Sequence, residues 1–354
     1  KCTVAGFELD KNMSIPSPVI RYLGYVPVSG DKPGFQLRQR PCDYPDPLYE
    51  APTGAVPPST SQPVWLTIKI PSNAAPGVYT GSAVIEAKVK GKNEKTAVPV
   101  SITVFSALLP EKRTLKVSNW PWFDSPVVTK RCGVDEIYSE PFWKLMEEVA
   151  KDMAFHRQNV ILTPVTAWVW KKEDAAETKE LVTAKIGKNG GLEFDFSLFA
   201  RWVTIFRNAG VDALIECGPL TKHPPRSKNK TEFKSVMWTI VDGKVEKAVV
   251  DAVSPEYEKY LSVFLPAFQA HLEEKGWADF YVQHIMDEPN VIRKPTYDHV
   301  AGCVKKYAPK IKRIDAVQTT DLVGLVDVWV PTMNKLAHSW DFYRERQNKG
   351  EEVW

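Results

Sequence analysis

The 354-residue sequence lacks several features that would assign it to a class at once. No run approaches the roughly 18 consecutive apolar residues of a membrane span, so no transmembrane helix is predicted. Lys and Arg number 46 against 43 Asp and Glu, and a net charge of +3 argues against nucleic acid as a partner. With 44% hydrophobic and 25% charged residues, the composition is that of an ordinary globular protein.

Cysteine is scarce and phosphate-binding glycine motifs are missing. The five cysteines have neither a CxxC pair nor Cys/His ligand spacing, so we expect no metal and no redox motif. A disulfide between Cys2 and Cys42 is conceivable, but free thiols are favoured. No GxGxxG or GxxxxGK[ST] turn follows a predicted strand, and no GxSxG elbow is present. These absences argue against a nucleotide cofactor and against serine-hydrolase chemistry.

The first third of the chain has the pattern of short β-strands. Apolar and polar residues alternate in Val64–Ile70 and in Ala83–Val89, and turn-forming residues separate these runs from their neighbours. No helical period intervenes. Residues 1–112 are therefore predicted to form an antiparallel β-sandwich domain, with Leu108–Arg113 as the linker that follows it.

Beyond the linker, strand-like runs alternate with helical patterns, which is typical of βα units around a parallel sheet. We predict a (β/α)8 TIM-type barrel over residues 113–354, apparently truncated near its seventh strand. The predicted strands are Thr114–Trp120, Asn159–Val165, Asp212–Cys217, Ala278–Met286, Lys312–Thr319, Asp327–Pro331 and Glu351–Trp354. The basic segment Lys222–Lys230 is interpreted as a solvated loop, because no aromatic residues are interleaved with its charges.

In such a barrel the working residues follow the C-terminal ends of the strands. The sequence has 12 Trp, and several of them fall there, where an indole suits the apolar face of a sugar ring. The alternative is that these Trp residues pack the core, and that His284 is a hydrogen-bonded core histidine. The candidate substrate-binding residues are Trp120, Trp168, His284, Thr320, Trp329, Asn334 and Trp354.

The sharpest candidate is the pair Asp287-Glu288, which follows the fourth predicted strand and precedes Pro289. Adjacent residues in a regular strand face opposite ways, so these two cannot easily act as carboxylates about 5 to 9 Å apart on either side of a glycosidic bond. At a strand end both can reach one ligand. One would then hold a substrate amide while the other protonates the leaving oxygen. The alternative is a structural role in loop capping or an ion pair.

Four segments, in their order and separation, resemble glycoside hydrolase family 123. They are Gln62–Ile68 (QPVWLTI), Ala75–Gly81 (APGVYTG), Val98–Val100 (VPV) and Met286–Pro289 (MDEP). The resemblance runs from about Gln62 to the end of the chain. Members usually continue into a C-terminal β-region, which has no counterpart in this sequence.

The resemblance implies a retaining exo-β-N-acetylgalactosaminidase that acts on glycans or glycolipids through an oxazoline intermediate. It implies that Asp287 orients the substrate's 2-acetamido group and that Glu288 is the general acid and then the general base. It also implies an exported protein, without a cofactor, whose partner is a carbohydrate with a terminal N-acetylhexosamine. Two alternatives stay open: a glycosidase with a second carboxylate such as Glu216 or Asp321, and a non-catalytic carbohydrate-binding protein. No oligomeric state is predicted.

Overall fold

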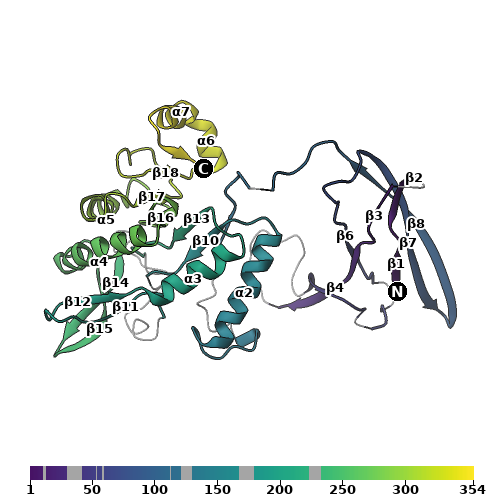
Figure 1. Ribbon diagram of the computed structural model, residues 1–354, viewed down its shortest axis with the longest axis horizontal. Coiled ribbons are helices and arrows are strands. Elements are labelled where there is room, and N and C mark those ends of the chain that lie inside the picture. The colour runs from purple at the N-terminus through teal and green to yellow at the C-terminus, as the bar shows by residue number, and fades with distance from the viewer. Residues whose placement is uncertain are drawn as a thin grey trace. The chain divides into compact units, whose positions relative to one another are not determined.

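The structure is a computed structural model that describes residues 1–10, 13–29, 42–52, 54–57, 60–111, 113–120, 130–166, 179–222 and 233–354. It divides into two compact units, Lys1–Glu111 and Lys112–Trp354 (Figure 1). The boundary predicted from the sequence lies at residues 112 and 113. Within the described ranges, no helix is long and apolar enough to cross a membrane.

The first unit consists of two antiparallel sheets that share one core. Phe7 and Tyr79 of the larger sheet and Tyr22 of the smaller one are buried in a single hydrophobic cluster, as predicted for a β-sandwich. The larger sheet contains β1 (Cys2–Val4), β2 (Phe7–Asp10), β3 (Met13–Ile15), β7 (Gly77–Val89) and β8 (Lys92–Val104). The smaller contains β4 (Val19–Val28), β5 (Cys42–Tyr49) and β6 (Val64–Thr67). All five cysteines are free, as favoured from the sequence.

The second unit is built on a parallel sheet of seven strands in the order β19-β18-β17-β16-β13-β10-β9. Their bounds are β9 (Ser118–Asn119), β10 (Val160–Thr163), β13 (Leu214–Cys217), β16 (Tyr281–His284), β17 (Lys312–Asp315), β18 (Val328–Trp329) and β19 (Glu352–Val353). Every neighbouring pair is parallel, as βα alternation predicts. The strands are shorter than predicted, so several expected strand residues lie in loops.

The predicted closed barrel is not observed: in the part of the chain that the structure describes, no strand pairing joins β9 to β19. The sheet is nevertheless curved, because side chains from five of its strands meet in one inner cluster, comprising Val160, Leu214, Val282, Ile314 and Val328. Contacts that involve side chains bridge the two edges. Lys116, just before β9, forms an ion pair with Glu352 of β19 at 2.5 Å, and Trp354 Nε1 donates to Lys116 O at 3.3 Å.

Helices cover the other side of the strands, and two of them, α2 and α4, begin at a serine whose side chain caps the first turn. The Ser254 side chain accepts a hydrogen bond from Tyr257 N at 3.2 Å, so Pro255 occupies the first helical turn. The helices are α2 (Glu140–Phe155), α3 (Ser197–Asn208), α4 (Pro255–Glu274), η2 (Ala278–Phe280), α5 (Lys294–Tyr307), α6 (Met333–His338) and α7 (Trp340–Asn348).

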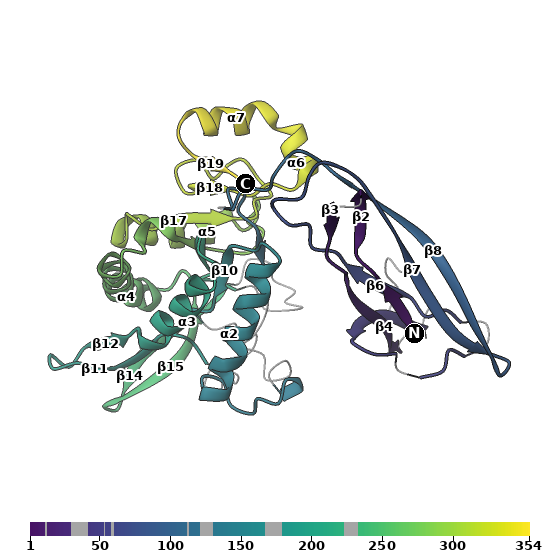
Figure 2. The ribbon, with the colours of Figure 1, turned by 45° about the vertical axis from the view of Figure 1, so that its right-hand side comes forward.

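Two hairpins were not predicted from the sequence. They are formed by β11 (Thr183–Ile186) with β12 (Leu192–Asp195), and by β14 (Lys234–Val241) with β15 (Lys244–Asp251). Figure 2 shows them side by side, projecting from the unit. Of the segment interpreted as a basic loop, Lys222 is buried and pairs with Lys234 in an antiparallel bridge, while the rest lies outside the described residues.

Candidate active site

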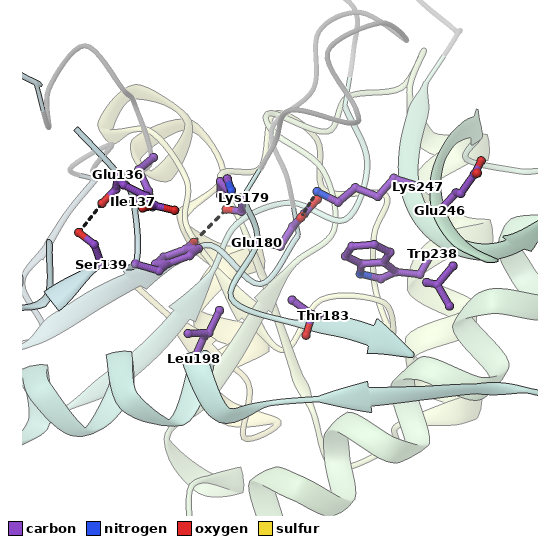
Figure 3. Close-up of a pocket in the computed structure, with 12 residues that line it drawn as sticks. Glu136, Ile137, Ser139, Lys179, Glu180, Thr183, Leu198, Trp238, Glu246 and Lys247 are labelled. Atoms are coloured by element: carbon purple, nitrogen blue, oxygen red, sulfur yellow. Dashed lines mark hydrogen bonds and ion pairs between the residues drawn. The ribbon is translucent and has the colours of Figure 1, made fainter. Parts of the chain in front are cut away.

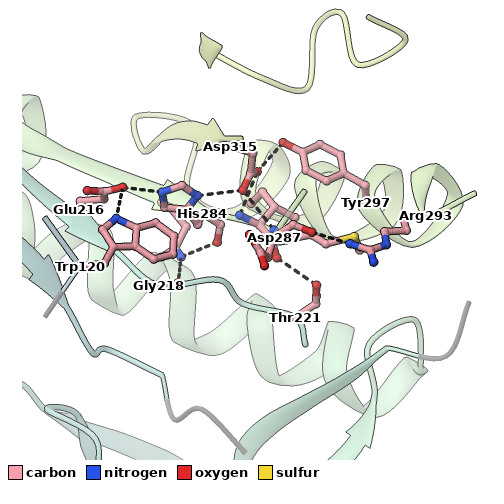
Figure 4. A network of polar contacts seen from close by, with 12 residues as sticks. Trp120, Glu216, Gly218, Thr221, His284, Asp287, Arg293, Tyr297 and Asp315 are labelled. Atoms are coloured by element: carbon pink, nitrogen blue, oxygen red, sulfur yellow. Dashed lines mark hydrogen bonds and ion pairs between the residues drawn. The ribbon is translucent and has the colours of Figure 1, made fainter. Parts of the chain in front are cut away.

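Asp287 and Glu288 lie on the turn that follows strand β16, and Figure 4 shows Asp287 there. The residues on either side are buried, since Met286 is 1% exposed and Pro289 also lies in the interior. The two acidic residues themselves are exposed. The chain therefore leaves the core at these two positions, and both carboxylates are available to a ligand at the C-terminal edge of the parallel sheet.

The backbone just before the turn is held from two sides. The Asp315 carboxylate, at the end of β17, accepts hydrogen bonds from Ile285 N at 3.1 Å and from Met286 N at 3.3 Å. Thr221, which follows β13, donates to Ile285 O from its backbone N at 3.1 Å and from Oγ1 at 3.0 Å. These bonds satisfy buried backbone groups where the β-ladder has ended, and they fix the direction in which the chain leaves the sheet.

The turn itself is held by its carbonyl oxygens. The Arg293 guanidinium donates to Asp287 O at 2.9 Å and to Glu288 O at 3.3 Å, while Gln318 N donates to Pro289 O at 2.9 Å. Glu288 has a φ of +47°, in the left-handed region that costs a non-glycine residue about 1–3 kcal/mol. A strained residue in a turn anchored at three successive carbonyls indicates that the backbone that carries the two carboxylates is held in one conformation before a ligand binds.

A buried ionic network lies beneath the turn (Figure 4). His284 Nε2 is 2.7 Å from Glu216 Oε1, and His284 Nδ1 is 3.0 Å from Asp315 Oδ1. All three side chains are at most 4% exposed. Ser118 Oγ donates to Glu216 Oε2 at 2.5 Å and Trp120 Nε1 donates to Glu216 Oε1 at 3.1 Å. Every oxygen of the Glu216 carboxylate therefore has a partner.

The network carries a positive charge between two acids. Burial alone would lower the pKa of His284, but hydrogen bonds to Asp315 and Glu216 outweigh it and raise this pKa to about 9. Burial works to raise the pKa of Glu216, yet the hydrogen bond from His284 leaves it lowered. For Asp315 burial dominates, so its pKa is raised even though Tyr297 Oη donates to Oδ2 at 2.8 Å. His284 is thus an imidazolium at neutral pH.

The carboxylates considered as an opposed catalytic partner lie in different environments. Glu216 is 3% exposed and paired with His284, so it is not free to attack or protonate a ligand. Asp321 is exposed in the loop after β17, where its backbone N donates to Thr319 Oγ1 at 3.3 Å. The network argues against Glu216 as a nucleophile, and Asp287 with Glu288 remains the exposed pair on the anchored turn.

The structure places the predicted ligand-binding residues in several settings. His284 is buried, with its ring edge-on to the half-buried Trp120 at a centroid distance of 5.1 Å. Trp354 is half-buried and packs against the inner cluster of the sheet. Thr320 is half-buried in the loop after β17, and Asn334 is exposed on α6. Contact of these residues with a ligand remains a prediction.

One of these predictions is wrong and another lies outside the described residues. Trp329 is fully buried and packs against Phe342 and Tyr343, at centroid distances of 5.3 and 6.1 Å, on the helix side of the sheet. It is a core residue because alternation along β18 points its neighbour Val328, not Trp329, into the inner cluster. Trp168 falls outside the described part of the chain.

The residues that hold the turn were missed by the sequence prediction. Asp315 was placed inside a strand expected to continue to Thr319, but β17 ends at Asp315 itself. Had the strand end been located correctly, the rule that working residues follow strand ends would have selected it. No role was predicted for Tyr297, which lies on α5, or for Arg293, which precedes that helix. Neither carries a local signal for its partner in the structure.

A separate cavity of about 690 Å³ lies between the start of α2 and the β14–β15 hairpin (Figure 3). Lys247 Nζ lies 5.0 Å from the centre of the Trp238 ring and forms an ion pair with Glu180 at 2.5 Å. Opposite them, Tyr138 Oη donates to Lys179 O at 2.9 Å. None of the residues that line this cavity belongs to the acidic turn or to the ionic network.

Among the described residues, one group offers three metal-ligand types close together. The ligand atoms of Glu258, His299 and Cys303 lie within 4.8 Å of one another, between α4 and α5. Glu258 Oε1 already accepts hydrogen bonds from Tyr307 Oη at 3.2 Å and Lys306 Nζ at 3.4 Å. The competing ammonium makes this group a poor cation site, and it contains no residue of the acidic turn.

Two family models match the chain. The model described as glycoside hydrolase 123, catalytic domain, matches residues 122–354, and the one described as glycoside hydrolase 123 N-terminal domain matches residues 29–87. The first match alone covers well over half of the chain and includes the acidic turn and most of the ionic network. A comparison with curated protein sequences gives no match.

Among solved structures, the chain is similar to a family 123 glycoside hydrolase from Clostridium perfringens, described in terms of glycolipid glycan hydrolysis. The TM-score is 0.75 at 16% identity, over 100% of this chain and 62% of that one. The chain thus spans less than two thirds of that relative's length, and at this identity the likeness concerns the fold. A β-D-glucuronidase from Dictyoglomus thermophilum aligns with a TM-score of 0.28 at 10% identity, over 94% of this chain and 46% of that one, too low to inform the fold.

Proposed function

Because this chain belongs to glycoside hydrolase family 123, we propose that it removes terminal β-linked N-acetylgalactosamine from glycans or glycolipids with retention of configuration. The observation that carries the proposal is the exposed, adjacent pair Asp287 and Glu288 on a turn whose backbone is anchored on both sides. The description of the Clostridium perfringens relative supports a glycolipid glycan as the substrate.

Adjacent carboxylates suit a reaction in which the substrate supplies its own nucleophile. Two protein carboxylates acting on opposite faces of a sugar must lie about 5 to 9 Å apart across it, which neighbouring residues on one turn do not readily achieve. If the 2-acetamido oxygen attacks the anomeric carbon instead, both protein groups can work from one side. Burial of Glu216 in the ionic network is consistent with this, because it removes one candidate for an opposed carboxylate.

In the first step the acetamido oxygen forms a bond to C1 while the bond from C1 to the leaving oxygen breaks. Glu288 donates its proton to that leaving oxygen, and Asp287 accepts a hydrogen bond from the acetamido N–H, which becomes positively charged as the oxazoline ring closes. In the second step water attacks C1 and transfers a proton to Glu288, and the ring opens. Two inversions at C1 give net retention.

We place this enzyme outside the cytoplasm, in the periplasm, at the cell surface or in the medium, because glycans and glycolipid headgroups are exposed there. Fractionation of the native source with an antibody to the chain, alongside a cytoplasmic marker, tests this placement. Recovery of the chain with the cytoplasmic marker would contradict it.

The activity is tested with paired substrates. Wild type, Asp287→Asn and Glu288→Gln should be assayed on an aryl β-N-acetylgalactosaminide, its N-acetylglucosamine counterpart and the matching galactoside without an acetamido group. The exposed pair Asp135 and Glu136 provides matched controls, Asp135→Asn and Glu136→Gln. We expect wild type and both controls to cleave the N-acetylgalactosaminide, and both active-site variants to be at least about 100-fold slower.

The leaving group separates the roles of the two acids. A good leaving group such as dinitrophenolate needs little protonation, so Glu288→Gln should lose much less activity on it than on an alkyl glycoside or glycolipid, whereas Asp287→Asn should lose activity on all of them. Cleavage of the galactoside at a similar rate would exclude substrate assistance. Binding of sugar without cleavage of any of these substrates would indicate a carbohydrate-binding protein instead.

A further inference from the structure

The buried network of Glu216, His284 and Asp315 contains charges that the proposed reaction does not use. The imidazole and both carboxylates are at most 4% exposed, so none of them can exchange a proton directly with a ligand. Burying three ionisable groups costs free energy that hydrophobic packing would not. A network retained at this cost beneath an acidic turn calls for a role at that turn.

The protonation state of His284 follows from the geometry. Each ring nitrogen faces a carboxylate oxygen, at 2.7 Å for Glu216 and 3.0 Å for Asp315. A neutral imidazole has one N–H donor and one acceptor nitrogen, so one of these two contacts would set a lone pair against a carboxylate oxygen. With both carboxylates ionised, only the imidazolium donates to both. The same conclusion follows from the pKa of His284, which its two partners raise to about 9.

Asp315 connects this charge to the active-site backbone. Its Oδ1 accepts from His284 Nδ1 and from Met286 N, and its Oδ2 accepts from Ile285 N and from Tyr297 Oη. Met286 immediately precedes Asp287, so any displacement of the Asp315 carboxylate moves the start of the acidic turn. Arg293 and Gln318 hold the later part of the turn through its carbonyl groups, independently of the network.

We propose that Asp315 and the His284 imidazolium together are the positioning unit for Asp287 and Glu288, and that loss of the imidazolium proton ends activity on the alkaline side. The proposal rests on the proposed function and deepens it at the same site. Loss of the proton removes one of the two donated hydrogen bonds of the ring. The Asp315 carboxylate then shifts, and the backbone N–H groups that it holds shift with it.

Substitution of two groups near His284 should shift its pKa in opposite directions. Glu216 reaches the ring from β13 and Asp315 from β17, Tyr297 reaches Asp315 from α5, and the indole N–H of Trp120 reaches Glu216. Glu216→Gln removes the negative charge that lies beside the imidazolium ring, which lowers the pKa of His284. Tyr297→Phe removes a donor from Asp315, which leaves that carboxylate a stronger acceptor for the imidazolium and raises the pKa of His284.

The pH dependence of kcat on a dinitrophenyl N-acetylgalactosaminide tests the proposal, because this leaving group needs little protonation and the alkaline limb then does not report loss of the Glu288 proton. Wild type should lose activity along an alkaline limb near pH 9. This limb should move to lower pH by at least half a unit in Glu216→Gln and to higher pH in Tyr297→Phe. Asp315→Asn should reduce kcat at pH 7 by 10- to 100-fold while KM changes less than threefold. The control is Glu352→Gln, which removes the ion pairs with Lys116 and Lys312 at the other end of the strands and should leave the limb in place.

A measurement without substrate keeps the proposal independent of the proposed activity. The chain has six histidines, so the ¹⁵N resonances of His284 can be assigned by their loss in His284→Gln and followed with pH. We expect them to titrate near 9 in wild type and to shift in opposite directions in the two network variants, even if no substrate is cleaved. If His284 titrates below 7, or if the limb stays fixed while the His284 resonances move, the positioning role is wrong. If Glu216→Gln fails to fold, Tyr297→Phe alone decides, through the direction of its shift.

Discussion

The two halves of the parallel sheet carry opposite chemistry on the same strands. Near the N-terminal ends, Leu214 of β13 and Val282 of β16 pack in the inner apolar cluster. Two residues further along, Glu216 and His284 belong to the ionic network. Residues two apart in a strand face the same side of a sheet, so the side chains on this face change from apolar to ionic within two residues.

This contrast separates stability from function along a single strand. The apolar half increases the free energy of unfolding through burial and tolerates no unpaired charge. The ionic half contributes less to this free energy than apolar packing would, but it holds the acidic turn in place. Substitutions in the two halves should therefore have distinct signatures. Substitutions of the exposed acids on the turn should change activity with little change in unfolding, and those in the apolar cluster should do the reverse.

The largest effect on activity is expected for Glu288→Gln. Removal of a general acid typically costs about 10²–10⁴ in rate, and we expect a loss of about 10³ in kcat on glycosides with poor leaving groups. Since the Glu288 side chain is exposed, the melting temperature should change by no more than about 2 °C. Steady-state kinetics and calorimetry on the same preparation measure both quantities. A large fall in melting temperature would mean that Glu288 belongs to the structural half of the contrast.

The reverse signature is expected for Ile314→Ala. Ile314 is fully buried in the inner cluster, and truncation of a buried Ile to Ala costs about 2–5 kcal/mol in the free energy of unfolding. It is the residue immediately before Asp315, which makes it a stringent test. Urea denaturation should show the loss, while kcat and KM of the remaining folded enzyme stay within about twofold of wild type. A tenfold fall in kcat would show that packing in the apolar cluster also positions the turn.

The ionic half should make stability fall at alkaline pH. The pKa of His284 is about 9 in the folded protein against a reference value of 6.5, so the folded state binds an extra proton between these values. The stabilisation is complete below pH 6.5 and is lost as pH rises through 9, with a slope of at most about 1.4 kcal/mol per pH unit. Denaturation curves between pH 6 and 10 measure it. His284→Gln should flatten the curve, and an unchanged slope would contradict the assignment.

Local patterns in the sequence were sufficient to predict where part of this site lies. The apolar run that ends at Met286, followed by two acids and a proline, predicts a strand end that presents Asp287 and Glu288, and the structure has both residues exposed there. The βα alternation likewise predicts a parallel sheet, because the period of each segment is set by its own residues.

The remainder depends on contacts between distant segments. Glu216, His284 and Asp315 come from three strands separated by up to 99 positions, and no spacing pattern relates them. Asp315 was missed because the end of a strand is set by hydrogen-bonding partners in other strands, which residue preferences do not specify. The left-handed φ of Glu288 is similarly imposed by Arg293 and Gln318, which hold the turn from outside it.

The smallest effect is expected at the opposite end of the strands, for Glu352→Gln. Glu352 forms ion pairs with Lys116 at 2.5 Å and Lys312 at 2.9 Å, and the three side chains are 33–49% exposed. Burial opposes ionisation, yet the two lysines leave the pKa of Glu352 lowered, so the pairs stabilise the fold at neutral pH and are lost as pH falls through that pKa. Solvent screening limits the loss in unfolding free energy to about 1 kcal/mol, and it should shrink in high salt. His284, near the C-terminal ends of the strands, should thus titrate at alkaline pH, and Glu352, near the N-terminal ends, at acidic pH. Titration of Glu352 should leave kcat unchanged. A fall in kcat in Glu352→Gln would show that the charge bridge between β19 and Lys116 reaches the acidic turn, and that the two halves of the strands are not independent.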